Sequence, residues 1–355
     1  MEESEISANE TAITVYRAGD TEIAPSPSAV VRPVAQVRLP AQVGPVSQAD
    51  DDAHLVQLWL HGKSPNTRDA YERDVRAFVD FADAPLARLT LQHVQDWSDR
   101  LAEAGLAAST RARKLSAVKS LLSFGHRLGY LMYNVGAAVS PPKHKDTLAE
   151  RILPEAAVHR VLAVADAAAS GAAAGPGGSF VQRRNALALR LFYASGGRVS
   201  EIAGLRWRDC VERSLERGRP TGQVTLFGKG GKTRRVLLSA DTWAALDAHR
   251  QREGSDGHPV TDGPVLRSRK ANADGSARPL TRQQLWRVVK GLAKRAGLPD
   301  AVSPHFFRHA HASHALDRGA PPHLVQQTLG HASLATTSRY AHARPDDSSA
   351  RYLGI

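Results

Sequence analysis

The chain has 355 residues, of which 42% are hydrophobic, and its formal net charge is +12. This length favours two folded domains with some additional chain. No stretch approaches the roughly 18 consecutive apolar residues of a membrane-spanning helix, and the acidic start lacks the apolar segment of a secretory signal. We therefore expect a cytoplasmic protein with no membrane partner.

Cys210 is the only cysteine in the chain. A single cysteine excludes an internal disulfide and any site that needs paired thiolates, such as a zinc ribbon or an iron–sulfur cluster. The sequence is therefore compatible with a reducing compartment.

The positive charge is unevenly distributed. Residues 1–54 contain nine acidic and three basic residues, so the rest of the chain carries a net charge of about +18. Arginine outnumbers lysine there, and its planar guanidinium can bind phosphate through two hydrogen bonds. A solvated basic surface would also explain the excess, but its size favours a polyanion such as nucleic acid as the partner.

The first part of the chain predicts a tail followed by a helical domain. Residues 1–52 show no helical or strand periodicity, so we expect a disordered acidic tail. Residues 53–140 predict a small domain of helices with a basic face. The predicted helix starts are Ser64–Pro65, Thr90 and Ser109–Thr110. The residues expected to face the core include Val75, Phe78, Leu91, Val94, Trp97, Leu115, Val118 and Leu122. The candidate nucleic-acid contacts on its outer face are Arg68, Arg73, Arg111, Arg113, Lys114 and Lys119.

A linker is expected at residues 141–150, because Pro141 and Pro142 cannot continue a helix. Its Lys143 and Lys145 are further candidate contacts to nucleic acid. The basic side chains therefore continue from the first domain into the linker.

Residues 151–355 predict a second domain that is mainly helical with a small β-hairpin. The β-rich runs Val224–Phe227 and Arg235–Leu238 flank a glycine-rich turn, as in a hairpin. The clearest helical pattern runs from Thr281 to Gly297. The low-complexity run Ala167–Gly178 predicts a flexible surface insertion. The whole chain is therefore expected to be mainly α with a small β element.

The first candidate motif surrounds Arg198, which follows Gly196 and Gly197 and is expected in the first turn of a helix. Backbone amides at a helix start favour an anion, and the guanidinium adds a two-point contact. A surface salt bridge between Arg198 and Glu201 is an equally good interpretation.

The second motif is the hairpin turn Gly228–Lys232, which presents Lys229. A lysine there can attract phosphate and deliver a proton to a departing oxygen. A solvated turn lysine is the commoner outcome.

The third motif begins at the expected helix cap Ser303 and places His305 and Arg308 one turn apart on one helix face. His305 and His309 also have the spacing of zinc ligands. However, the glutamate of a zinc protease and a nearby third ligand are both lacking. A metal site is therefore not expected.

The fourth motif ends at Tyr340. Gly330 is expected to end one helix and Ser333 to cap the next, which places Tyr340 about two turns into that helix. Taken alone, Tyr340 fits an ordinary core residue. The region also fits a helix-turn-helix, but arginines at base-reading positions are sparse.

In this order and spacing, the four motifs resemble the tyrosine recombinase (phage integrase) family, nearest the Xer-type site-specific recombinases. The resemblance covers Leu55 to the C-terminus. It implies a helical, SAM-like core-binding domain and a mixed, mostly helical catalytic domain. It also implies the catalytic residues Arg198, Lys229, His305, Arg308, His331 and Tyr340.

The resemblance implies a covalent mechanism in which Tyr340 attacks a phosphodiester. The two arginines would hold the non-bridging oxygens, and His331 would donate a further hydrogen bond. His305 would act as general base and Lys229 would protonate the leaving 5′ oxygen. The 3′-phosphotyrosyl product conserves the bond energy, so no ATP, metal or other cofactor is expected.

The implied partners are double-stranded DNA and further protomers. A homo- or hetero-tetramer would assemble on two recombination sites, with residues 341–355 of each protomer docking on a neighbour and a second recombinase or activator as a further partner. A mobile-element integrase or transposase of the same family is the first alternative, but the acidic tail favours a Xer-like role in chromosome partition. A catalytically silent DNA-binding regulator is the second alternative, and it has no need for both Lys229 and Tyr340.

Overall fold

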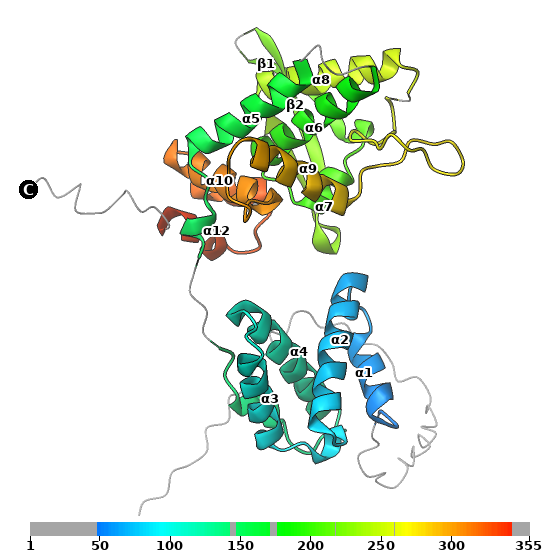
Figure 1. The fold of residues 1–355 in the computed structure, drawn as a ribbon, viewed down its shortest axis with the longest axis vertical. Helices are drawn as coiled ribbons and strands as arrows, with labels where there is room; N and C mark the ends of the chain where they lie inside the picture. The colour runs from blue at the N-terminus through cyan, green and yellow to red at the C-terminus, as the bar shows by residue number, and fades with distance from the viewer. Residues whose placement is uncertain (1–47, 143–146, 171–175, 217, 259, 343–355) are drawn as a thin grey trace, which may run out of the picture. The chain divides into compact units, whose positions relative to one another are not determined.

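The structure is a computed structural model that describes residues 48–142, 147–170, 176–216, 218–258 and 260–342. The chain divides into two compact units, residues 1–143 and residues 144–355 (Figure 1). None of the helices in the described ranges is both long and apolar enough to cross a membrane. Each unit has its own hydrophobic core.

Within residues 48–142, the first unit is a bundle of four α-helices. Its elements are α1 (Asp52–Leu60), α2 (Pro65–Ala82), η1 (Leu86–Arg88), α3 (Leu91–Glu103), α4 (Ala108–Arg127) and η2 (Val135–Ala138). Local chemistry explains the starts: Pro65 occupies the first turn of α2, and the N-cap Thr90 forms a reciprocal capping pair with His93. Ala49 is buried and Asp51 caps α1, so both residues of the expected tail belong to this folded unit.

The core of this bundle follows the predicted stripes with one exception. Phe78 and Trp97 meet edge to face, with ring centroids 5.9 Å apart. The other buried residues include Leu55, Val75, Val94, Leu115, Val118 and Leu122. The prediction that Leu91 faces inward is wrong, because it is 38% exposed at the first position of α3, where no preceding turn covers it.

The second unit is mainly helical around a small sheet. Its helices are α5 (Glu155–Ser170), α6 (Pro176–Ser195), α7 (Val199–Ala203), α8 (Ala240–Ser255), α9 (Arg282–Arg295), α10 (Pro304–Asp317), α11 (Pro322–Leu329) and α12 (Leu334–His342). Its 3-10 turns are η3 (Ala149–Arg151), η4 (Trp207–Asp209) and η5 (Lys229–Gly231). The expected fold class, mainly α with a small β element, is confirmed.

The sheet has three antiparallel strands, β1 (Cys210–Glu216), β2 (Arg219–Phe227) and β3 (Thr233–Leu238), in that order. The predicted hairpin corresponds to β2 and β3. Strand β1 was not predicted, because its polar residues hide the alternation of apolar and polar residues that marks a half-buried strand.

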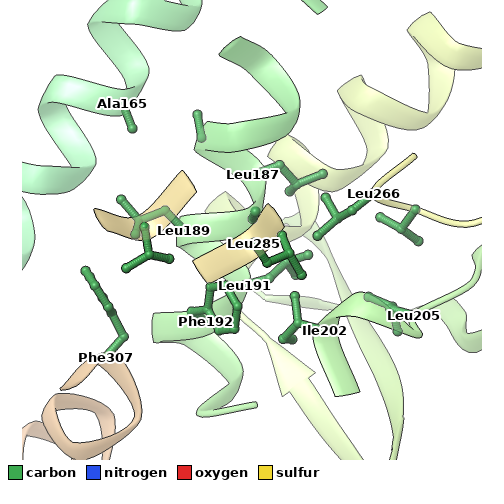
Figure 2. Packing of buried hydrophobic residues seen from close by; sticks show 14 of the residues in the cluster. Ala165, Leu187, Leu189, Leu191, Phe192, Ile202, Leu205, Leu266, Leu285 and Phe307 are labelled. Atoms are coloured by element: carbon green, nitrogen blue, oxygen red, sulfur yellow. The ribbon is translucent and has the colours of Figure 1, made fainter. Parts of the chain in front are cut away.

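Helix α6 lies in the middle of the core of the second unit. Its buried residues Leu187, Leu189, Leu191 and Phe192 lie among side chains from several other elements (Figure 2). Those neighbours include Ala165, Ile202, Leu205, Leu266, Leu285 and Phe307. The central helix thereby fixes the loop that follows its last residue, Ser195, and leads into the site.

Part of the predicted insertion Ala167–Gly178 is helical. Helix α5 continues to Ser170 and α6 begins at Pro176, while residues 171–175 lie outside the described ranges. Alanine has the highest helix propensity, so an alanine-rich run extends a helix as readily as it forms a loop.

Candidate active site

Arg198 is held by a loop that packs tightly against α11. It is the N-cap of the five-residue helix α7, one residue earlier than the predicted first turn. Gly196 has a φ of +58°, and a Cβ built there would lie 2.5 Å from Leu329. A Cβ on Gly197 would lie 2.7 Å from Ile202. The two glycines therefore allow the backbone to lie closer to Leu329 and Ile202 than a residue with a Cβ atom could.

Glu201 organises the basic side chains around this loop. Its side chain is 0% exposed and accepts hydrogen bonds from the Arg198 backbone amide at 2.7 Å and from Arg198 Nη1 at 2.9 Å. Arg234 of β3 donates from Nη1 and Nη2 at 2.8 and 2.7 Å. Burial alone would raise the pKa of Glu201, but hydrogen bonds from Arg234 and Arg198 lower it to about 2. The predicted Arg198–Glu201 pair exists, but its carboxylate is buried rather than on the surface.

Arg234 was missed in the sequence, although its position carried a signal. It precedes Val236 and Leu238 on the inward face of β3, and its side chain is 10% exposed. A buried arginine needs a carboxylate partner, so this pattern predicts a buried acid nearby. Glu201 is that acid.

Two arginines bind the carbonyl groups at the end of α11. Arg308 is 4% exposed and donates to Gly196 O at 2.6 Å and to Leu329 O at 2.7 Å. Arg234 Nε donates to Thr328 O at 2.6 Å. The last carbonyls of a helix have no partners within it and carry partial negative charge, so the guanidiniums stabilise this end. Burial and the neighbouring Arg198 and Arg234 lower the pKa of Arg308 to about 10.

Tyr340 lies in the seventh position of α12, as the spacing predicts. It is 4% exposed and packs with Ala312, Leu316, Val325 and Leu329. Its hydroxyl oxygen lies 2.9 Å from Nδ1 of His309. Burial raises the pKa of Tyr340, and Arg308 opposes that shift. Tyr340 is therefore both a core side chain and a neighbour of Arg308.

His331 stacks on the Tyr340 ring, with centroids 6.2 Å apart and planes inclined by 6°. Its Nδ1 lies 3.0 Å from Thr337 Oγ1. Burial, followed by Arg308 and Arg198, lowers the pKa of His331 to about 4. The imidazole is therefore neutral at pH 7, and it can donate from Nε2 if Thr337 donates to Nδ1.

His305 and His309 occupy different positions although both belong to α10. His305 is exposed at the surface, and partial desolvation of its ring, followed by the charge of Arg308, lowers its pKa. His309 reaches the Tyr340 hydroxyl instead, although the sequence suggested for it only a metal-ligand role. Both line a pocket of about 540 Å³. Within the described residues, no group of three or more His, Cys, Asp or Glu could hold a metal ion.

The turn that carries Lys229 lies beside the Glu201 cluster. The Gly228 amide donates to Lys232 O at 2.7 Å, which closes the turn. A Cβ on Gly228 would lie 3.2 Å from Glu201 Oε1 and 3.9 Å from Arg198 Nη1. The Lys229 side chain itself lies outside the described part of the structure.

Three basic side chains of α4 that were expected to be displayed have partners within the first unit. Arg113 forms an ion pair with Asp74, and Lys114 Nζ lies 3.3 Å from the same carboxylate. Lys119 donates to Val139 O. Lys114 and Lys119 are half-buried because these partners lie below the surface. Their role in binding DNA stays a prediction.

The other candidate contacts differ in exposure. Arg68 and Arg73 on α2 are exposed, whereas Arg111 is half-buried on α4. Lys143 and Lys145 lie outside the described residues. The structure therefore leaves α2 as the best-exposed basic helix among these candidates.

Comparison with known proteins assigns both units. The family model "Phage integrase family" matches residues 167–346, and "Phage integrase, N-terminal SAM-like domain" matches residues 52–129. Tyrosine recombinase XerD of Bifidobacterium longum is 30% identical over 82% of this chain and 91% of its own length. XerD of Brucella suis is 35% identical over 79% and 88%.

Solved structures share the fold. XerH bound to palindromic difH in a post-cleavage complex has a TM-score of 0.63 and 23% identity, covering 84% of this chain and 83% of that chain. A lambda integrase dimer bound to a core site has a TM-score of 0.60 and 18% identity, covering 84% and 79%. With the matched family models and the Xer relatives, these findings show that the chain belongs to the phage integrase family, near the Xer tyrosine recombinases.

Proposed function

We propose that the chain is a Xer-like site-specific recombinase that cleaves and rejoins double-stranded DNA through a 3′-phosphotyrosyl intermediate. The observation that carries the proposal is the position of Tyr340, whose hydroxyl and ring lie among His309, His331 and the buried Arg308. Attack on a phosphodiester builds negative charge on the non-bridging oxygens, and fixed positive groups stabilise that charge.

Arg198 and Arg308 bind the scissile phosphate in this proposal. Glu201 fixes the first guanidinium, and two backbone carbonyls fix the second. Because these contacts exist before DNA binds, little reorganisation is needed when charge develops. His331 adds a hydrogen bond from Nε2.

Lys229 is proposed as the general acid that protonates the leaving 5′ oxygen. Its turn lies beside Arg198 and Glu201, and Arg198 is the residue proposed to bind the same phosphate. The phosphotyrosyl bond stores the energy of the broken phosphodiester, and rejoining reverses the step. Neither ATP nor a metal ion is needed in this scheme.

Cleavage also requires movement near α12, because Tyr340 is 4% exposed. A phosphodiester can reach its hydroxyl only if α12 or the side chains that cover it shift. We propose that assembly on DNA produces this shift. A lambda integrase dimer on a core site and a tetramer on a Holliday junction are solved structures with this fold, and they support a tetramer of like or mixed protomers.

A Xer-like role is preferred to a mobile-element role because curated relatives at 30–35% identity are named XerD or XerC. The decisive experiment maps covalent adducts between the protein and genomic DNA. A single chromosomal locus supports a Xer role in chromosome partition, whereas junctions of a mobile element support integration.

The Tyr340→Phe variant tests the chemistry. It should bind a nicked suicide duplex that carries the mapped site but form no covalent adduct. Tyr133→Phe is the matched control, because Tyr133 is 71% exposed in the first unit and should leave adduct formation unchanged. An adduct that persists in Tyr340→Phe contradicts the proposal.

A further inference from the structure

The buried hydroxyl of Tyr340 must lose its proton when the oxygen attacks phosphorus. Its pKa is raised by burial, so the ionised form is scarce at neutral pH and a proton acceptor is needed. The structure places His309 Nδ1 at 2.9 Å from this hydroxyl. That distance is within the range for direct transfer of the proton.

His309 also connects the buried hydroxyl to solvent. Its ring lines the pocket of about 540 Å³ whose other walls are Arg151, Ala301, Ser303, His305 and Phe306. Tyr340 does not line this pocket. An imidazole has two nitrogen atoms, so one can face the tyrosine while the other exchanges a proton with water.

We infer that His309, rather than His305, accepts the proton of Tyr340 and passes it to water in this pocket. This inference rests on the proposed function. In the step, the Tyr340 O–H bond breaks and its proton moves to Nδ1, while the proton on Nε2 leaves to water. The tyrosine oxygen forms a bond to phosphorus, the bond from phosphorus to the 5′ oxygen breaks, and that oxygen takes a proton from the general acid.

The charges around His309 disfavour a ring that is protonated on both nitrogens. They therefore favour onward transfer of one proton to water. Burial, His305, Arg151, Arg308 and Arg339 all lower the pKa of His309, to about 4. The ring is therefore neutral at pH 7 and able to accept a proton. A doubly protonated ring would be repelled by the same cations, so release of the second proton removes that cost.

The test compares His309→Ala and His309→Asn in single-turnover cleavage of the nicked duplex that carries the mapped site. Both variants should form the adduct at least about 100-fold more slowly, as expected on loss of a general base. Asparagine can still hydrogen-bond to the tyrosine but cannot relay a proton. Free imidazole should restore part of the rate of His309→Ala. The exposed His323 of α11 provides the matched control, His323→Ala, which should cleave at the wild-type rate.

Two results would overturn the inference. One is a wild-type rate for His309→Asn, which would reduce His309 to a positioning residue. The other is imidazole rescue of His305→Ala but not of His309→Ala. Equal DNA binding and equal melting temperatures of the variants exclude misfolding as the cause of any loss.

A measurement without DNA separates this inference from the proposed function. Nitrogen NMR of the wild-type protein should show Nδ1 of His309 without a hydrogen and accepting a bond, and Tyr340→Phe should shift its signal. A protonated Nδ1 in the wild-type protein overturns the relay whether or not the protein cleaves DNA. Absence of any adduct in the wild-type protein, by contrast, contradicts the proposed function itself.

Discussion

Each unit of the chain contains a buried carboxylate between two basic side chains. In the first unit, Asp74 of α2 has a side chain that is 4% exposed and pairs with Arg113 and Lys114. In the second unit, Glu201 is 0% exposed and pairs with Arg198 and Arg234. The interaction is the same, but its surroundings differ.

The difference lies in what the basic partners touch next. Arg113 and Lys114 both belong to α4 and are 45% and 20% exposed, so Asp74 joins two helices at the surface of a bundle. Arg234 also donates a hydrogen bond to Thr328 O at the end of α11, and Arg308 binds the same helix end through Leu329 O. A buried ion pair is weak evidence for function by itself. It becomes functional evidence where its partners converge on a reactive group.

Among the residues of these two ion-pair clusters, the largest effect is expected for Glu201→Gln, which removes the charge that fixes two guanidiniums. Misplacing a preorganised donor costs on the order of 100-fold or more in rate, so adduct formation should fall by about that factor. Single-turnover cleavage with saturating DNA measures it. A rate within about two-fold of wild type would show that Arg198 needs no carboxylate to hold its position.

Asp74→Asn should lower stability without slowing the chemical step. Removing one partner of a fully buried pair costs roughly 3 to 5 kcal/mol, but the exposure of Arg113 reduces the expected loss to about 2 kcal/mol. Urea unfolding of the first unit measures the loss. A slower chemical step at saturating DNA would show that the two carboxylates share a role.

Stability should depend on pH in the second unit through its histidines. The described histidines with a lowered pKa are His249, His305, His309, His311, His314 and His331. A lowered pKa means that the unfolded chain binds more protons, so stability is complete above about pH 6.5 and is lost as the pH falls towards 4.

The pKa values of His309 and His331 are each lowered to about 4. Both rings are partly exposed, so screening reduces the contribution of each to on the order of 1 kcal/mol. Hydrogen exchange between pH 7 and 4 should therefore show the second unit opening more readily at low pH, and His309→Asn should reduce the slope. Constant protection of the second unit across this range contradicts the prediction.

Local signals predicted the parts of the fold that depend on neighbouring residues. Ser64, Thr90 and Thr281 precede helices, and Gly330 has the left-handed φ of +66° that ends α11. The spacing after Ser333 then placed Tyr340 correctly. By contrast, β1 lacks the alternation of apolar residues that marks a strand.

The site was less predictable, because its contacts join residues that are distant in sequence. The motifs contained Arg198, Arg308 and Tyr340, whereas the contacts of Arg234 with Glu201 and of His309 with Tyr340 depend on the packing of distant segments. Nothing in the helical spacing of His305 and His309 indicates which of them reaches a tyrosine 31 residues later. The order of residue types suggests the chemistry, but the fold decides which neighbours act on it.

The smallest effect is expected at Gly330, where a pair of variants can separate the cost of backbone strain from the effect of displacing Arg234. Gly330→Ala places a Cβ in a left-handed residue, which costs about 1 kcal/mol, and 3.2 Å from Arg234 Cδ. Gly319 has a φ of +82° with nothing within 4 Å of a built Cβ, so Gly319→Ala carries the backbone cost alone. Both variants should melt lower by a similar amount, but only Gly330→Ala should slow adduct formation, by a few-fold, because its methyl group displaces Arg234. Equal rates of adduct formation in the two variants would show that cleavage tolerates displacement of Arg234. The ion pairs of Glu201 would then matter as little for the chemical step as those of Asp74.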